Sequence, residues 1–206
     1  LLSSYEGVVS AETGHVNCHE SGAIEASGHK VITLPHHEGK LDAGELEGLL
    51  KTFWGDETYE HMVFPGMVYI SHPTEYGTLY TKAELEAIGK VCRKYDLILF
   101  VDGARMAYGL GAEGNDLTLA DYAAISDVFY VGGTKAGALF GEAVVITDER
   151  LKKDFRYMIK RQGGMLAKGR LLGIQYEVLM EDDLYTELGR HANVLAAKIK
   201  EAFLRK

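Results

Sequence analysis

Cysteine is scarce in this sequence. Only Cys18 and Cys92 occur among its 206 residues. Two thiols are too few for a disulfide framework and are typical of the reducing cytoplasm, where we expect the protein to act. Neither cysteine belongs to a C-x-x-C pair, and the adjacent His36 and His37 would point to opposite faces of an extended segment. The sequence therefore predicts no metal site.

Long apolar runs and an excess of basic residues are also missing. No stretch of about 18 apolar residues predicts a membrane span. The first residues show no basic segment followed by an apolar core, so we expect no signal peptide there. Lys and Arg number 22 against 30 Asp and Glu, which gives a formal net charge of −8. We therefore expect neither nucleic acid nor a membrane as a partner.

Strands and helices alternate along the chain. Short apolar runs at 67–71, 97–101 and 128–131 are typical of buried strands. The segment 82–95 has helical periodicity, and Thr81 before it is a capping residue. This alternation predicts an α/β fold with a mainly parallel sheet and helices on both faces. Further helices are predicted at 19–27, 41–53 and 148–160.

Charged residues stand where two of these apolar runs end. Asp102 directly follows the run 97–101, and Lys135 follows the run 128–131 after two glycines and a threonine. In an open α/β sheet, ligands bind outside the carboxyl ends of the strands. We therefore expect Asp102, Arg105 and Lys135 to converge on one crevice.

These residue types suit pyridoxal 5'-phosphate (PLP). A lysine amine forms a Schiff base with a carbonyl compound, and a carboxylate pairs with the pyridinium nitrogen of this cofactor. A lysine buried at a strand end among glycines would leave room for the ring. Arg105 is the candidate for the substrate carboxylate, because its planar fork matches that group, and Thr134 is a candidate donor to the cofactor phosphate. The alternative is that Asp102 caps a helix and Lys135 is a solvated charge.

Four segments carry a resemblance to a known family. They are DGAR at 102–105, GGTKAGALFGEA at 132–143, AETGHVNCHESGAIEASGHKV at 11–31 and YISHPTEYGTLYTKAEL at 69–85. Together and in this order, they resemble the low-specificity threonine aldolases and aromatic amino acid β-eliminating lyases, which are PLP-dependent enzymes of fold type I. The resemblance covers nearly the whole chain.

The resemblance implies a PLP-dependent lyase of the threonine aldolase type. Such an enzyme cleaves threonine or allo-threonine by retro-aldol chemistry to glycine and an aldehyde. Lys135 would form the Schiff base, and Asp102 would face the ring nitrogen. Fold and cofactor do not decide the reaction, so β-elimination or transamination of another amino acid is an alternative. A non-catalytic α/β domain is a second alternative.

The resemblance also implies roles for residues near other strand ends. His15 is expected to stack on the cofactor ring and to take part in catalysis. His72, with Ser71, is expected to contact the substrate close to its side-chain hydroxyl and to act in catalysis. Each histidine has a simpler interpretation, His15 as a core or loop residue and His72 as a strand-end residue without a function. Glu20 follows the family pattern, or is only a charge favoured by a helix dipole.

The ends of the printed chain depart from the family pattern. Residues 1–10 contain no Gly/Thr turn that would hold the cofactor phosphate at a helix N-terminus, so we expect a fragment. A PLP-binding large domain is expected over 1–160, and helices leading into an incomplete second domain over 161–206. Because fold-type-I enzymes build their sites across a two-fold interface, we expect a homodimer or homotetramer. The long loop 54–65 is a candidate contact.

Overall fold

The computed structural model describes residues 2–205, so positions 1 and 206, the outer limits of the two predicted domains, lie outside the described residues. Within residues 2–205, six strands form one sheet in the order β2-β1-β3-β4-β5-β6. Neighbours from β2 to β5 pair in parallel, and β6 runs antiparallel to β5. The strands are β1 (Glu6–Ala11), β2 (Val31–Leu34), β3 (Phe64–Ser71), β4 (Ile98–Asp102), β5 (Val128–Gly132) and β6 (Glu142–Ile146).

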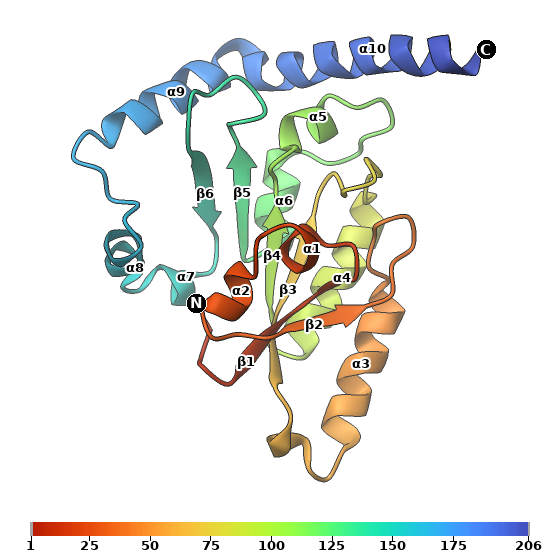
Figure 1. The fold of residues 1–206 in the computed structure, drawn as a ribbon, viewed down its shortest axis with the longest axis vertical. Coiled ribbons are helices and arrows are strands. Elements are labelled where there is room, and N and C mark those ends of the chain that lie inside the picture. The colour runs from red at the N-terminus through yellow and green to blue at the C-terminus, as the bar shows by residue number, and fades with distance from the viewer. Residues whose placement is uncertain (1, 206) are drawn as a thin grey trace.

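Helices connect the strands and continue beyond β6 (Figure 1). The α-helices are α1 (His15–Cys18), α2 (Ala23–Ala26), α3 (Ala43–Gly55), α4 (Lys82–Lys94), α5 (Met106–Leu110), α6 (Leu119–Ile125), α7 (Glu149–Lys152), α8 (Phe155–Arg161), α9 (Arg170–Met180) and α10 (Leu184–Leu204). Two 3-10 helices are η1 (Tyr59–His61) and η2 (Glu181–Asp183).

One face of the sheet is sealed by α3, α4 and α6. Strand side chains alternate between the two faces, and Val68 and Leu99 point to this one, where they are fully buried. Leu46 of α3, Leu85 of α4 and Tyr122 of α6 belong to the same apolar core. Burying each such side chain contributes about 1.5–3 kcal/mol relative to exposing it. This core fixes the strands whose ends carry the charged residues.

The opposite face is covered more lightly. In Figure 1, α1 and α2 lie in front of the sheet, whereas α4 and α6 lie behind it. Tyr69, Phe100 and Tyr130 point to the front face and are only half-buried. Tyr69 and Phe100 stack with their ring centroids 4.9 Å apart. The front face therefore presents aromatic side chains directly beside the carboxyl ends of the strands.

Helices α9 and α10 cross the molecule at the carboxyl end of β5 (Figure 1). The long α10 packs against α5. A Cβ atom at Gly189 would lie 1.9 Å from the carbonyl oxygen of Ala107, so glycine permits this close approach of the two helices. Helix α10 therefore packs closely against α5, the helix that directly follows Arg105.

Two predicted helices are broken. The predicted helix 19–27 is wrong, because Ser21 and Gly22 have φ values of 52° and 71° and separate α1 from α2. The predicted helix 148–160 is divided into α7 and α8 by Asp154, whose φ is 58°. Left-handed backbone of this kind ends an α-helix.

The predicted fold class is confirmed, since a mainly parallel sheet carries helices on both faces. Among residues 2–205, no helix combines the length and apolar character that a membrane crossing requires.

Candidate active site

A crevice opens at the edge where the parallel strands end. Its cavity has a volume of about 230 Å³. Asp102 ends β4, Lys135 follows β5, and His15 begins α1 after β1, so three strand ends contribute to it. The side chains and backbone that line the cavity belong to His15, Glu20, Asp102, Ala104, Arg105, Tyr130, Thr134, Lys135 and Glu142.

Two glycines allow the ends of β4 and β5 to meet. The amide of Gly132 donates to the carbonyl of Gly103 at 2.9 Å. A Cβ atom at Gly103 would lie 1.9 Å from the carbonyl oxygen of Tyr130, and one at Gly132 would lie 2.5 Å from the carbonyl oxygen of Gly103. No larger residue fits at either position, so the glycines of the two motifs bring Asp102 and Lys135 into one crevice.

The carboxylate of Asp102 is held by three donors. The Tyr69 hydroxyl donates to Oδ2 at 2.8 Å, and the amide of Ala104 donates to Oδ1 at 2.9 Å. The Tyr130 hydroxyl also donates to Oδ1. Asp102 is only 5% exposed. These donors fix the carboxylate of Asp102 in the lining of the crevice. The alternative, in which Asp102 only caps a helix, does not describe this contact set.

Lys135 lies in the loop between β5 and β6 and is exposed. This differs from the expected burial, because the loop leaves the sheet after Gly132 and carries the side chain to the open rim of the cavity. Its backbone is nevertheless fixed, since the Tyr108 hydroxyl donates to the Lys135 carbonyl. Lys135 thus lines the crevice from a loop whose backbone is held by Tyr108.

The same loop is tied to β6 through Glu142. The amide of Gly133 donates to Oε2 of Glu142 at 2.5 Å, and the Thr134 hydroxyl donates to Oε1 at 3.0 Å. Thr134 therefore donates to a carboxylate in this structure, which differs from the phosphate contact expected of it. Sequence reasoning missed Glu142, although its place in the segment 132–143 was a signal.

His15 is oriented by two carboxylates. Its ring Nδ1 donates to Oε1 of Glu20 at 2.6 Å, and its backbone amide donates to Oε1 of Glu75 at 3.0 Å. Glu20 lines the cavity together with His15. The Nδ1 contact leaves Nε2 as the ring atom that can accept a proton. Glu75 was also missed from the sequence, because nothing local marks a contact 60 residues distant.

The crevice has the strand-end Asp and Lys of a known family. A family model described as beta-eliminating lyase matches residues 1–203. The chain belongs to the beta-eliminating lyase family. The resemblance predicted from the four segments is thereby confirmed.

Three proteins named threonine aldolase are similar to this beta-eliminating lyase family member over almost the whole chain. The low specificity L-threonine aldolase of Pseudomonas sp. (strain NCIMB 10558) is 35% identical over 199 residues, 94% of this chain and 55% of that protein. Its Pseudomonas aeruginosa counterpart is 32% identical over 203 residues, 98% of this chain and 58% of that protein. The structure of Leishmania major threonine aldolase is 50% identical, with a TM-score of 0.92, over 97% of this chain and 57% of that chain. This chain therefore spans about half the length of these relatives.

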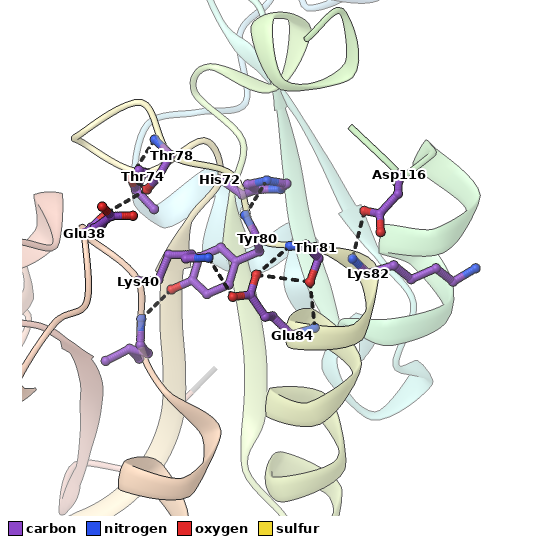
Figure 2. Close-up of polar contacts among 11 residues, drawn as sticks. Glu38, Lys40, His72, Thr74, Thr78, Tyr80, Thr81, Lys82, Glu84 and Asp116 are labelled. Atoms are coloured by element: carbon purple, nitrogen blue, oxygen red, sulfur yellow. Dashed lines mark hydrogen bonds and ion pairs between the residues drawn. The ribbon is translucent and has the colours of Figure 1, made fainter. Parts of the chain in front are cut away.

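His72 does not face the crevice in this beta-eliminating lyase family member. It is 0% exposed, and its Nε2 accepts from the Tyr80 amide at 3.1 Å while Nδ1 is hydrogen-bonded to the Tyr122 hydroxyl. Figure 2 shows it beside Tyr80, whose hydroxyl accepts from the amide of Leu41 at 2.7 Å. Burial lowers the pKa of His72 to about 4. The ring is therefore a neutral part of the core in this structure, and the expected substrate contact stays a prediction.

A polar clamp holds the segment that follows His72 (Figure 2). The Thr81 hydroxyl accepts from the Glu84 amide, and the Glu84 carboxylate accepts from the Thr81 amide at 2.7 Å, which forms a capping box at the start of α4. Lys40 donates to Glu84 at 2.6 Å. These contacts hold the end of the segment between β3 and α4, while the Tyr80 amide and the Tyr122 hydroxyl hold the His72 ring in the core.

Ser71 does not line the cavity. It is 7% exposed, and its hydroxyl donates to Oε1 of Glu75 at 2.5 Å. The expected direct contact of Ser71 with substrate is not found in this geometry. Through Glu75, Ser71 instead supports the backbone of His15.

Arg105 lies between the crevice and a second cavity. The second cavity has a volume of about 470 Å³ and is also lined by Tyr108 of α5 and Asn193 of α10. Arg105 is half-buried and lines both cavities. Of the seven predicted site residues, five line the crevice, and His72 and Ser71 do not. In the described part of the chain, no group of three or more His, Cys, Asp or Glu side chains is placed to hold a metal ion.

Proposed function

We propose that the protein is a PLP-dependent lyase that cleaves threonine or allo-threonine to glycine and an aldehyde. The observation that carries this proposal is that Asp102 and Lys135, which follow β4 and β5 at the carboxyl edge of the sheet, line one crevice. The relatives named threonine aldolase support the choice of reaction. The proposal concerns the whole protein, since the chain spans about half the length of those relatives.

The residues of the crevice fit PLP. Lys135 would hold the cofactor covalently through its exposed amine, and Asp102 would pair with the ring nitrogen. His15 would lie on the ring face, and Arg105 would bind the substrate carboxylate through its planar fork. When bound, PLP supplies an acceptor for the electron pair released as the substrate Cα–Cβ bond breaks.

The chain's own residues would control the proton and the substrate orientation. With Nδ1 donating to Glu20, Nε2 of His15 is free to accept the proton of the substrate hydroxyl. The carboxylate of Glu20 then stabilises the imidazolium, as the acidic member of a catalytic triad does. Arg105 fixes the amino acid at its carboxylate, so that the hydroxyl is presented to His15. Thr134 is not proposed as a phosphate ligand while Glu142 accepts its hydrogen bond.

Assays of the PLP-loaded protein with four amino acids test this proposal. Threonine and allo-threonine should give glycine and acetaldehyde in equal amounts. Pyruvate and ammonia from serine, or indole from tryptophan, would instead support the alternative of β-elimination. An amino group passed to a keto acid would support transamination. No turnover of any of the four, with full cofactor occupancy, would contradict the lyase assignment.

We also propose that the protein is a cytoplasmic homodimer or homotetramer. Both cysteines are free thiols in the structure, which suits a reducing compartment. Large apolar side chains are exposed on helices α9 and α10, and exposed apolar patches are typical of an interface. They include Leu171, Ile174 and Val178 of α9 and Val194, Leu195 and Ile199 of α10. Light scattering should give a mass of two or four chains, and a monomer at micromolar concentration would contradict this.

The division into a large domain over 1–160 and a following segment over 161–206 is likewise a proposal. Gly163, with a φ of 79°, ends α8 before the chain continues to α9. This break is consistent with a boundary close to residue 161.

A further inference from the structure

Asp102 in the crevice has two tyrosine partners that its proposed pairing with the cofactor does not itself require. Two tyrosine hydroxyls, one from each neighbouring strand, donate to the single carboxylate of Asp102. Tyr69 of β3 donates to Oδ2 at 2.8 Å, and Tyr130 of β5 donates to Oδ1. Asp102 of β4 lies between them.

Strand register produces this arrangement. Ser71 pairs with Asp102 and Tyr69 with Phe100, so Tyr69 and Asp102 lie on the same face of the sheet, two pairs apart along the strands. Val128 pairs with Phe100, which places Tyr130 on that face as well. A one-residue shift of either strand would move its tyrosine to the sealed face.

The donors leave one acceptor position open. An ionised carboxylate has about four lone-pair positions on its two oxygens. Oδ1 accepts from Tyr130 and from the Ala104 amide, whereas Oδ2 accepts only from Tyr69. The position that remains is therefore on Oδ2. Asp102 lines the crevice while being only 5% exposed, which suits a single incoming N–H group.

We infer that Tyr69 and Tyr130 are positioning residues, which orient Asp102 so that Oδ2 alone receives the protonated ring nitrogen of the cofactor. This rests on the proposed PLP-dependent function. Burial, and then the charge of Asp102, raise the pKa of both tyrosines far above the usual range, so the phenols stay protonated and keep donating. Each donated hydrogen bond also reduces the basicity of the carboxylate, which keeps the proton on the ring nitrogen.

The test compares isosteric variants of the PLP-loaded protein. Tyr69→Phe and Tyr130→Phe each delete one donor, Asp102→Asn is the positive control, and Tyr80→Phe is the matched control. Tyr80 is buried, and its hydroxyl is hydrogen-bonded to the Leu41 amide rather than to Asp102. The cofactor carries nitrogen-15 in its ring, and its nitrogen resonance is recorded with the melting temperature, kcat and KM for threonine.

Loss of either phenol that donates to Asp102 makes the carboxylate more basic and draws the proton away from the ring. The nitrogen resonance of Tyr69→Phe should therefore move toward that of an unprotonated pyridine. Its kcat should fall about tenfold with little change in KM, since one hydrogen bond to a charged group is lost. Tyr130→Phe should shift in the same direction. Tyr80→Phe should lose thermal stability to a similar degree without a shift.

Wild-type resonances in both Tyr69→Phe and Tyr130→Phe, beside a clear shift in Asp102→Asn, would overturn the inference. Failure of both crevice variants to fold while Tyr80→Phe folds would also overturn it, because the phenols would then be needed for the fold itself. Failure of the proposed function is seen separately, as the absence of a cofactor absorption band in the wild-type protein.

Discussion

At the scale of single residues, His15 of the crevice is held by two carboxylates, one that accepts from its ring and one that accepts from its backbone amide. His15 donates from Nδ1 to Glu20 and from its amide to Glu75. If its ring lies on the cofactor, His15→Phe should retain PLP better than His15→Ala, because aromatic stacking survives only in the first variant. Equilibrium dialysis of PLP against both variants measures this. Equal dissociation constants would instead indicate a structural histidine.

The buried His72 predicts a pH dependence of stability. Burial lowers its folded-state pKa to about 4 from an ordinary value of 6.5, against opposing effects of Asp116 and Glu84. Above pH 6.5 the ring is neutral in both states. Between pH 6.5 and 4 only the unfolded chain takes up the proton, so the free energy of unfolding should fall by roughly 3 kcal/mol as the pH is lowered.

Urea unfolding at pH 7 and pH 4 measures this change, with His72→Phe as the control. The variant lacks the titrating ring but keeps every other group, so its free energy of unfolding should depend less on pH. The same decrease in both proteins would show that other residues cause it.

At the scale of elements, the loop between β5 and β6 is braced by a carboxylate. Glu142→Ala removes the acceptor of the Gly133 amide and the Thr134 hydroxyl. We expect deuterium exchange of the amides in 133–141 to rise about tenfold, equivalent to roughly 1.4 kcal/mol of lost protection. Mass spectrometry of the exchanged protein measures this. Glu57→Ala, in an exposed loop after α3, is the control, and an unchanged exchange rate in Glu142→Ala would contradict the bracing role.

Much of the element order could be predicted from the sequence, because apolar runs and capping residues are local signals. Thr81 and the start of α4 are one example. The break between α1 and α2 was missed, since Ser21 is not a residue that usually adopts left-handed backbone. Strand-end logic brought Asp102 and Lys135 together correctly, because parallel strands end at one edge of the sheet.

Side-chain direction could not be predicted in the same way. The family pattern placed His72 near substrate, but its ring is drawn inward by Tyr80 and Tyr122. The contact of Tyr69 and Tyr130 with Asp102 depends on the register between strands, and a single sequence does not reveal that register.

At the scale of the whole molecule, the two faces of the sheet have different roles. The sealed face carries the apolar core and supplies stability, while the lightly covered face and the carboxyl edge carry the polar groups. The crevice needs both, since five parallel strands must be held in register for their ends to meet.

Covalent mapping of the cofactor tests the central claim most directly. The PLP-loaded protein is reduced with borohydride and digested, and the modified peptide is sequenced by mass spectrometry, with Lys135→Arg as the control. We predict a single pyridoxyl group on Lys135, which is lost in the variant. A pyridoxyl group on another lysine, or on none, would contradict the assignment of Lys135 and with it the proposed function.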